Sequence, residues 1–188
     1  MSGTLFPGWR PDAAGREQLA ALAARVEAAW PADAPRLRMR RPDQWHATLC
    51  FIGRDMAHAV TPALLDALAG VAARVAPLVT EIGGLDYWRG PGVVVALPRD
   101  PAPLQALCDG IDAAVRGCGI TTARPTTRPH VTLAHTDRGL PHLPWLAGVD
   151  GAGGPLRVDG FELLFNPGAR YEPLGSWRLT GRATAIAG

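Results

Sequence analysis

Three stretches of the chain carry apolar residues at intervals of three and four, a spacing that is typical of amphipathic helices. The first follows Pro11-Asp12, and the others start at Thr61-Pro62 and Asp100-Pro101, where a polar capping residue precedes a proline. We interpret all three apolar stripes as core faces. They comprise Leu19, Leu22, Val26 and Ala29 in the first helix, Leu64, Leu65, Leu68, Val71, Ala72 and Val75 in the second, and Leu104, Leu107, Cys108, Ile111 and Val115 in the third.

Seven further stretches are apolar or alternate between apolar and polar residues, and most are bounded by proline or glycine, as strands often are. They span Arg36–Arg40, His46–Ile52, Leu78–Ile82, Val93–Leu97, His130–His135, Arg157–Phe165 and Ser176–Ala183. Several follow one another without a helix between them, which favours an α+β fold with antiparallel pairing over a doubly wound parallel sheet. No glycine-rich dinucleotide fingerprint follows any of these stretches.

Two of the predicted strands repeat the pattern His-x-Thr-Leu. The copies are His46-Ala47-Thr48-Leu49 and His130-Val131-Thr132-Leu133, and this repetition indicates two equivalent halves. Because side chains alternate along a strand, we expect the histidine and threonine of each copy on one face. In the first copy, Ala47, Leu49 and Phe51 are expected on the other face.

These polar faces predict a water-accessible cleft in which the two histidines cleave a phosphodiester. Burying an unpartnered imidazole or hydroxyl costs roughly 1–3 kcal/mol, so a water-accessible cleft is the cheaper place for both strands. Residues i and i+2 of a strand lie about 6.5–7 Å apart, which lets a histidine and a threonine reach different oxygens of one phosphate. With an ordinary pKa near ~6.5, one imidazole can accept a proton while the other donates one, as metal-free cleavage of a phosphodiester requires.

The composition is that of a globular protein. The 188 residues are 47% hydrophobic and 19% charged, which predicts one compact unit. The sequence has no run of about 20 apolar residues, and no basic and apolar leader opens it. We therefore expect a soluble, cytoplasmic protein that does not contact membranes.

All 19 basic residues are arginine, and the chain has no lysine. Lysyl-adenylate ligation, Schiff-base chemistry and the Walker phosphate loop are excluded, because each needs an amine at a fixed place. The net charge of +2 is too small to coat a long polyanion, so a nucleic-acid partner is expected to be short or held locally. Arg36, Arg38 and Arg40 predict a basic strand edge that is either solvated or follows an RNA backbone.

The cysteines and the remaining histidines indicate no further chemistry. Cys50, Cys108 and Cys118 form no even set and no C-x-x-C pair, so free buried thiols are expected, with a position along the cleft as an alternative for Cys50. His130, His135 and His142 could suggest a metal site. However, positions 130 and 135 have opposite parity unless a bulge intervenes, and we expect no metal.

The ordered motifs resemble the 2H phosphoesterase superfamily and, within it, the bacterial RNA 2′,3′-cyclic phosphodiesterases, also called 2′-5′ RNA ligases. Residues 41–53 look like the first motif block of this family, and residues 128–134 look like the second. Supporting similarity comes from residues 87–89 and from residues 168–171 with Leu174 and Trp177. The resemblance covers most of the chain.

This resemblance implies a two-lobed α+β fold with pseudo-two-fold symmetry, in which residues 1–188 form one domain with outer helices and a central cleft. It implies hydrolysis of a 2′,3′-cyclic phosphate at an RNA end to a 2′-phosphate, without metal or cofactor and with 2′-5′ ligation as a side reaction. His46 is then the proton donor and His130 the proton acceptor, while Thr48 and Thr132 bind the phosphate. Further substrate contacts are expected from Arg128, His135, Arg124, Arg41 and Tyr87, in a monomer.

Two positions depart from the family pattern. His135 stands where the family often has arginine directly after the second motif, so one phosphate-binding charge is reduced unless Arg128 or Arg124 replaces it. The opening Thr4-Leu5-Phe6 begins like the first strand of the family, but Pro7-Gly8 interrupts it, which predicts a short or edge strand. Two alternatives stay open: a related 2H enzyme acting on small cyclic nucleotides or 2′-5′ linkages, and a non-catalytic module that binds RNA ends.

Overall fold

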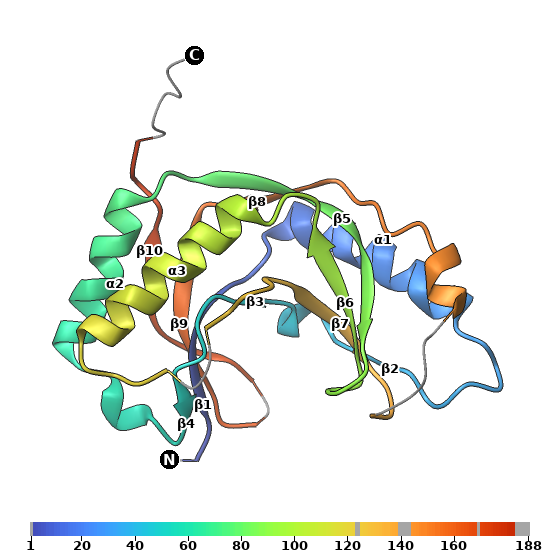
Figure 1. The fold of residues 1–188 in the computed structure, drawn as a ribbon, viewed down its shortest axis with the longest axis horizontal. Coiled ribbons are helices and arrows are strands. Elements are labelled where there is room, and N and C mark those ends of the chain that lie inside the picture. The colour runs from blue at the N-terminus through green and yellow to red at the C-terminus, as the bar shows by residue number, and fades with distance from the viewer. Residues whose placement is uncertain (1, 123–124, 139–143, 169, 183–188) are drawn as a thin grey trace.

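A curved sheet of antiparallel strands organises the chain (Figure 1). The computed structural model describes residues 2–122, 125–138, 144–168 and 170–182. Its strands are β1 (Thr4–Trp9), β2 (Arg38–Met39), β3 (Ala47–Thr48), β4 (Gly53–Arg54), β5 (Leu78–Trp88), β6 (Val93–Pro98), β7 (Val131–His135), β8 (Pro155–Val158), β9 (Gly160–Asn166) and β10 (Glu172–Arg178). Their order is β10-β9-β1-β3-β7-β6-β5-β8, with β2 attached to β7 and β4 to β1. The predicted α+β class with antiparallel pairing is confirmed.

Strand β1 passes through Pro7 and lies inside the sheet, so the prediction of a short or edge strand was wrong. It pairs with β9 on one side and with β3 and β4 on the other. The carbonyl of Pro7 accepts hydrogen bonds from Leu49 and Cys50, at 2.9 and 3.4 Å. Because the nitrogen and carbonyl of a strand residue face the same neighbour, the missing N–H falls opposite the gap between β3 and β4. The ladder with β9 is therefore unaffected.

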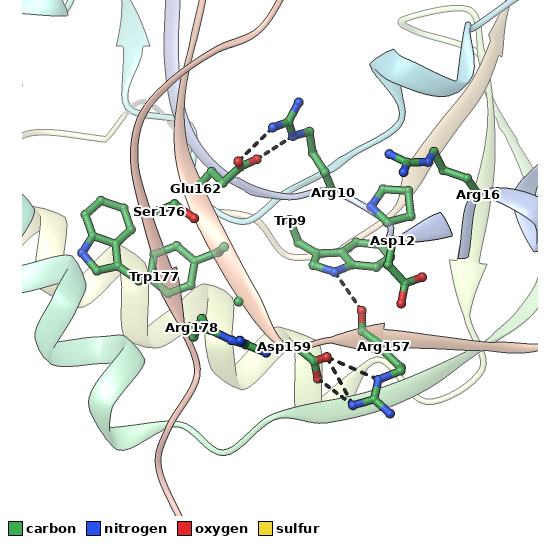
Figure 2. A pocket seen from close by; sticks show the side chains of 13 residues that line it. Trp9, Arg10, Asp12, Arg16, Arg157, Asp159, Glu162, Ser176, Trp177 and Arg178 are labelled. Carbon is green, nitrogen blue, oxygen red and sulfur yellow. Dashed lines mark hydrogen bonds and ion pairs between the residues drawn. The ribbon is translucent and has the colours of Figure 1, made fainter. Parts of the chain in front are cut away.

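Other strand boundaries were also predicted incorrectly. The stretch Arg157–Phe165 divides at Asp159 into β8, which pairs with β5, and β9, which pairs with β1. At this division the indole nitrogen of Trp9 donates to the carbonyl of Arg157 at 3.0 Å, and Arg157 pairs with Asp159 (Figure 2). The predicted strand at 36–40 shortens to β2, β5 extends to Trp88, and β10 ends at Arg178, while residue 183 lies outside the described residues.

The first two helices start where their capping residues predict, and the third starts one residue later than predicted. They are α1 (Ala13–Ala29), α2 (Pro62–Arg74) and α3 (Ala102–Gly117). The Asp12 carboxylate accepts the Gly15 amide at 2.7 Å, and the Thr61 hydroxyl accepts the Leu64 amide at 3.2 Å. At α3, Pro101 is the N-cap and the Asp100 carboxylate accepts the Ala102 amide at 3.0 Å. Within the described ranges, no helix is long and apolar enough to cross a membrane.

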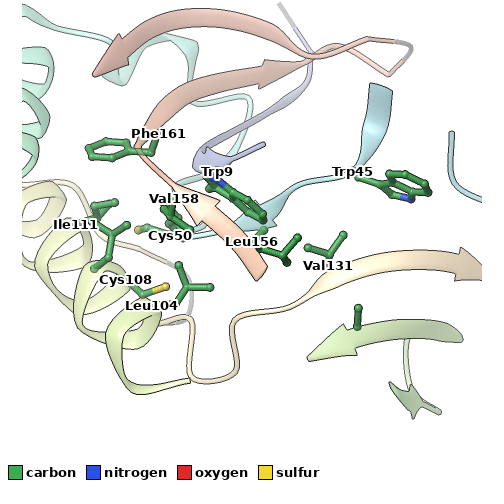
Figure 3. Packing of buried hydrophobic residues seen from close by; sticks show 14 of the residues in the cluster. Trp9, Trp45, Cys50, Leu104, Cys108, Ile111, Val131, Leu156, Val158 and Phe161 are labelled. Carbon is green, nitrogen blue, oxygen red and sulfur yellow. The ribbon is translucent and has the colours of Figure 1, made fainter. Parts of the chain in front are cut away.

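The helices cover the outer side of the sheet, with α2 and α3 together at one end and α1 at the other (Figure 1). Figure 3 shows the packing around α3, where Leu104, Cys108 and Ile111 meet side chains from the sheet. The predicted helix faces are buried apart from Ala29, which is exposed at the end of α1, and Leu65 and Val75, which are half-buried. The opposite face of the sheet is left to the polar side chains of the two motifs.

Candidate active site

The two His-x-Thr motifs meet at the pairing of β3 with β7. Ala47 lies opposite Val131 in this antiparallel ladder. Continued by one residue in each direction, the register places His46 opposite Thr132 and Thr48 opposite His130. Side chains at directly opposite and diagonal positions of a ladder lie roughly 5–8 Å apart. The four half-buried polar side chains therefore share one face, as the repeated motif predicts.

Both imidazoles are held in the same way. Nδ1 of His46 lies 2.9 Å from the carbonyl oxygen of Gln44, and Nδ1 of His130 lies 2.8 Å from that of Arg128. A carbonyl oxygen only accepts hydrogen bonds, so each Nδ1 carries the hydrogen and donates it. In the neutral ring Nε2 is then the basic nitrogen, and it is left to exchange protons with a bound molecule.

Aromatic neighbours make both imidazoles weak bases in the free protein. The His46 ring lies 5.1 Å from Phe6 and 4.8 Å from Tyr171, and the His130 ring lies 4.2 Å from Trp88. Burial is the main cause that lowers the pKa of His46 to about 4, against the opposing hydrogen bond to Gln44. Burial likewise lowers the pKa of His130. The charge of His130 also contributes to lowering the pKa of His46.

A hollow of about 640 Å³ opens beside His130 and Thr48. Phe51, Trp88 and residues 125–128 complete its lining. The guanidinium of Arg128 donates to Asp86 at 2.9 Å and lies 5.1 Å from the Trp88 ring centre, while the Trp88 indole also donates to Asp86, at 3.0 Å. Asp86 thus fixes an arginine and an aromatic ring together as one wall of the hollow.

Phe51 lies on the opposite face from that expected, whereas Cys50 is buried as expected. Strand β3 ends at Thr48, and residues 49–52 are irregular before β4 starts at Gly53, so the alternation of faces is lost there. Phe51 consequently lines the hollow, whereas Cys50 is fully buried with its sulfur 3.8 Å from Asp112 on α3. Burial raises the pKa of the Cys50 thiol to about 12. The thiol does not face the groove, by which we mean the sheet face that carries His46, Thr48, His130 and Thr132 together with the hollow beside it.

The prediction of free buried thiols is confirmed for Cys50 and Cys108 but not for Cys118. Cys50, Cys108 and Cys118 are free thiols, the first two buried and the third half-buried. Among the described residues, no group of three or more histidines, cysteines or carboxylates could hold a metal ion. His142 lies outside those residues.

A bulge in β7 turns His135 toward the groove. Val94 pairs with Ala134 but Val95 pairs with Thr132, so Leu133 has no partner on β6. Leu133 and Ala134 are both buried, and the alternation resumes one residue late. His135 therefore shares the face of Thr132, despite the opposite parity expected for a regular strand. Burial, followed by the charges of Arg40 and Arg38, lowers its pKa.

Arg40 is a residue of this face that sequence reasoning did not assign to the site. Its amide donates to the carbonyl of Leu133 at 2.7 Å, at the edge of β7 that also pairs with β3. Its charge contributes to lowering the pKa values of His46, His135 and Tyr171. The alternation of Arg36, Arg38 and Arg40 just before the first motif was the available signal, but it did not reveal which arginine turns inward.

The other predicted substrate contacts fall into two groups. Arg128 and His135 reach the groove face. Arg41 is exposed and pairs with Asp43 at 3.1 Å, and the Tyr87 hydroxyl donates to the carbonyl of Asp137 at 3.2 Å, so neither is brought to the hollow. Trp88, the residue after Tyr87, takes the position in the groove, and Arg124 lies outside the described residues.

A second hollow of about 400 Å³ lies beyond His46, at the ends of β1, β9 and β10 (Figure 2). Arg10 and Glu162 form an ion pair at its border, with a contact of 2.8 Å. The charge of Arg10 also contributes to lowering the pKa of His46. This hollow holds none of the four motif side chains, so it is distinct from the candidate active site.

The curled antiparallel sheet and its three outer helices have the LigT-like 2H phosphoesterase fold. Residues 19–164 match the 2′-5′ RNA ligase superfamily, and the chain belongs to that superfamily.

Solved structures share this fold. E. coli LigT complexed with 3′-AMP matches with a TM-score of 0.70 and 24% identity, covering 96% of this chain and 99% of LigT. TT0787 of Thermus thermophilus matches with a TM-score of 0.74 and 24% identity, covering 96% and 100%. The MHV ns2 PDE domain matches with a TM-score of 0.51 and 16% identity, covering 87% and 98%. No curated protein sequence matches the chain significantly.

Proposed function

We propose that the protein hydrolyses the 2′,3′-cyclic phosphate at an RNA end to a 2′-phosphate. One observation carries the proposal: each imidazole donates Nδ1–H to the carbonyl two residues upstream, so both keep Nε2 for proton transfer. Membership of the 2′-5′ RNA ligase superfamily supports it, as does the binding of 3′-AMP by E. coli LigT, which has the same fold. A cytoplasmic monomer remains the expectation from the sequence.

In this mechanism Nε2 of His130 accepts a proton from water as the water oxygen attacks phosphorus opposite the 3′ oxygen. The bond between phosphorus and the 3′ oxygen breaks, and protonated His46 donates its Nε2 proton to that oxygen. The hydroxyls of Thr48 and Thr132 donate to non-bridging oxygens. Each proton transfer contributes typically ~10²–10⁴-fold to the rate. Exchange of protons with solvent then restores both imidazoles.

The hollow beside His130 offers a place for the terminal nucleoside. Trp88 and Phe51 supply aromatic surface on which a base can stack, and the hydroxyls of Thr126 and Thr127 lie in the same wall. With the phosphate between the two imidazoles, the base would lie on the side of Thr48 and His130. Stacking of this kind tolerates different bases, so we expect little base specificity.

An assay of product identity tests the proposal. The protein is incubated with EDTA and an oligonucleotide that ends in a 2′,3′-cyclic phosphate, and the phosphorylated end is identified by mass and by its sensitivity to a 3′-phosphatase. A 2′-phosphate is expected. Binding without turnover would instead favour a module that binds RNA ends. Turnover confined to mononucleotides or to 2′-5′ dinucleotides would favour a related enzyme of the same superfamily.

The pH dependence of the rate should show both imidazoles. The mechanism needs neutral His130 and protonated His46, and the pKa values of both lie below ~6.5 in the free protein. We therefore expect a bell-shaped profile of kcat/KM with its maximum below pH 6.5, whose limbs belong to the coupled pair. Bound anionic phosphate favours imidazolium, so kcat should peak at a higher pH. Initial rates from pH 4 to 9 measure both profiles, and a flat profile would contradict the acid–base roles.

A further inference from the structure

We propose that Arg40 is the phosphate-binding cation of the groove, where its guanidinium holds a non-bridging oxygen beside Thr132 and His46. This inference rests on the proposed phosphodiesterase function and adds a residue to its substrate contacts. The backbone of Arg40 pairs beside the motifs, its side chain lies on the groove face, and nearby arginines are held in ion pairs.

The backbone brings Arg40 to the place where the motifs meet. One edge of β7 pairs with β2, and further along the same edge pairs with β3. Between these pairings residues 41–45 leave the edge as a loop. The amide of Arg40 bonds to Leu133 on one side of this loop, and His46 returns opposite Thr132 on the other. Arg40 and His46 thus flank consecutive residues of β7.

Alternation continued one residue past the end of β2 turns the side chain of Arg40 toward the groove. Arg38 lies opposite His135, and His135 shares the face of Thr132 because of the bulge. Met39 packs against the core on the other face. Two residues after Arg38, Arg40 returns to the groove face, where it is half-buried. Its influence on His46, His135 and Tyr171, which come from three different segments, agrees with this position.

Three other arginines near the groove are already engaged, and Arg38, opposite His135, is exposed. Arg128 pairs with Asp86 at 2.9 Å, Arg41 with Asp43 at 3.1 Å, and Arg10 with Glu162 at 2.8 Å. No carboxylate pairs with Arg40 in the part of the chain that the structure describes.

His135 does not replace that charge. Burial, together with the neighbouring arginines, lowers the pKa of its imidazole and leaves the ring neutral near pH 7. A guanidinium stays charged at every working pH, and its fork of N–H donors fits two phosphate oxygens. A half-buried arginine without an anion beside it is therefore suited to bind one from the substrate.

The test compares Arg40→Gln with the control Arg36→Gln. Arg36 is an exposed arginine of the same segment, and its replacement removes the same charge. Inorganic phosphate is the binding probe, measured by calorimetry, and a 2′,3′-cyclic mononucleotide is the substrate. We expect Arg40→Gln to weaken phosphate binding about tenfold or more and to lower kcat/KM about 10²-fold. Arg36→Gln should stay within about twofold of the unmodified protein, as single exposed charges contribute little.

Two further variants separate charge from packing. Arg40→Lys keeps the positive charge, although lysine cannot bind phosphate in a bidentate manner. Its loss of phosphate-binding free energy should therefore be less than half of the loss in Arg40→Gln. Adding His135→Arg to Arg40→Gln places a guanidinium on the same face from β7, and phosphate affinity should rise again at least about threefold. NMR titration of the histidine rings in Arg40→Gln should show higher pKa values for His46 and His135, which also confirms that the variant is folded.

The outcomes distinguish this inference from the proposed function. Folded Arg40→Gln with unchanged phosphate affinity and unchanged kcat/KM overturns the assignment of Arg40, even if the protein hydrolyses cyclic phosphates. If the unmodified protein does not hydrolyse them, yet its phosphate affinity depends on Arg40 and not on Arg36, the proposed function fails and the assignment of Arg40 stands.

Discussion

Replacing His130 with alanine is expected to lower kcat/KM on a 2′,3′-cyclic nucleotide by about 10²–10⁴-fold, because the attacking water then has no base. His46→Ala removes the proton donor to the leaving oxygen and should cause a loss of the same order. The two histidines act in the same step, one on the attacking water and the other on the departing oxygen, so the double variant should lose much less than the product of the single losses. Initial rates on the purified variants at several pH values measure these effects.

His58→Ala is the matched control for both changes. His58 is exposed in a short 3-10 turn, Ala57–Ala59, away from the motif strands. Its removal should leave the rate unchanged within about twofold. The rings of His46 and His130 are half-buried at the groove and outside the hydrophobic core, so the melting temperature should change little in all three variants. Large losses of stability in His46→Ala and His130→Ala, with activity in proportion to folded protein, would indicate structural histidines instead.

The shared face of the histidine and threonine in each motif could be predicted because it depends on short-range geometry. Within a regular strand the side chains alternate, so His46 and Thr48 share a face whatever the rest of the chain does. The same holds for His130 and Thr132. The structure then pairs Ala47 with Val131, which brings the two polar faces together. Two copies of one pattern sufficed for this part of the site.

Positions just beyond these strands could not be predicted, because alternation fails wherever a strand ends or bulges. A slip of one residue moves every later side chain to the other face. The irregular residues 49–52 turn Phe51 toward the hollow, and the bulge at Leu133 brings His135 to the groove. The irregular segment and the bulge both depend on which strands pair with each other, and strand pairing cannot be predicted from a single sequence.

Arg40 shows the same limit for charges. Three of its neighbours in the fold are more than ninety positions away in the chain. They are Leu133, His135 and Tyr171. Local alternation indicated a basic edge but gave Arg36, Arg38 and Arg40 equal weight. Only the pairing of β2 with β7 distinguishes the half-buried Arg40 from the exposed Arg36 and Arg38.

Lowering the pH from 7 to 5 is expected to reduce the free energy of unfolding by about 2 kcal/mol through His46 alone. The pKa of His46 is about 4 in the folded protein, against about 6.5 in an unfolded chain. The unfolded state therefore takes up the proton first. The stabilisation is complete above pH 6.5 and is lost as the pH falls toward 4. His130 and His135 act in the same direction, since burial lowers both of their pKa values.

Urea unfolding at pH 7 and pH 5 measures this loss. His46→Gln keeps a polar side chain of similar size that does not titrate, so it should lose about 2 kcal/mol less than the unmodified protein between the two pH values. His58→Gln should behave like the unmodified protein, because His58 is exposed. Equal losses in all three proteins would show that the His46 ring is not desolvated. Inorganic phosphate should reverse part of the loss, because an anion beside the ring raises its pKa and binds only the folded state.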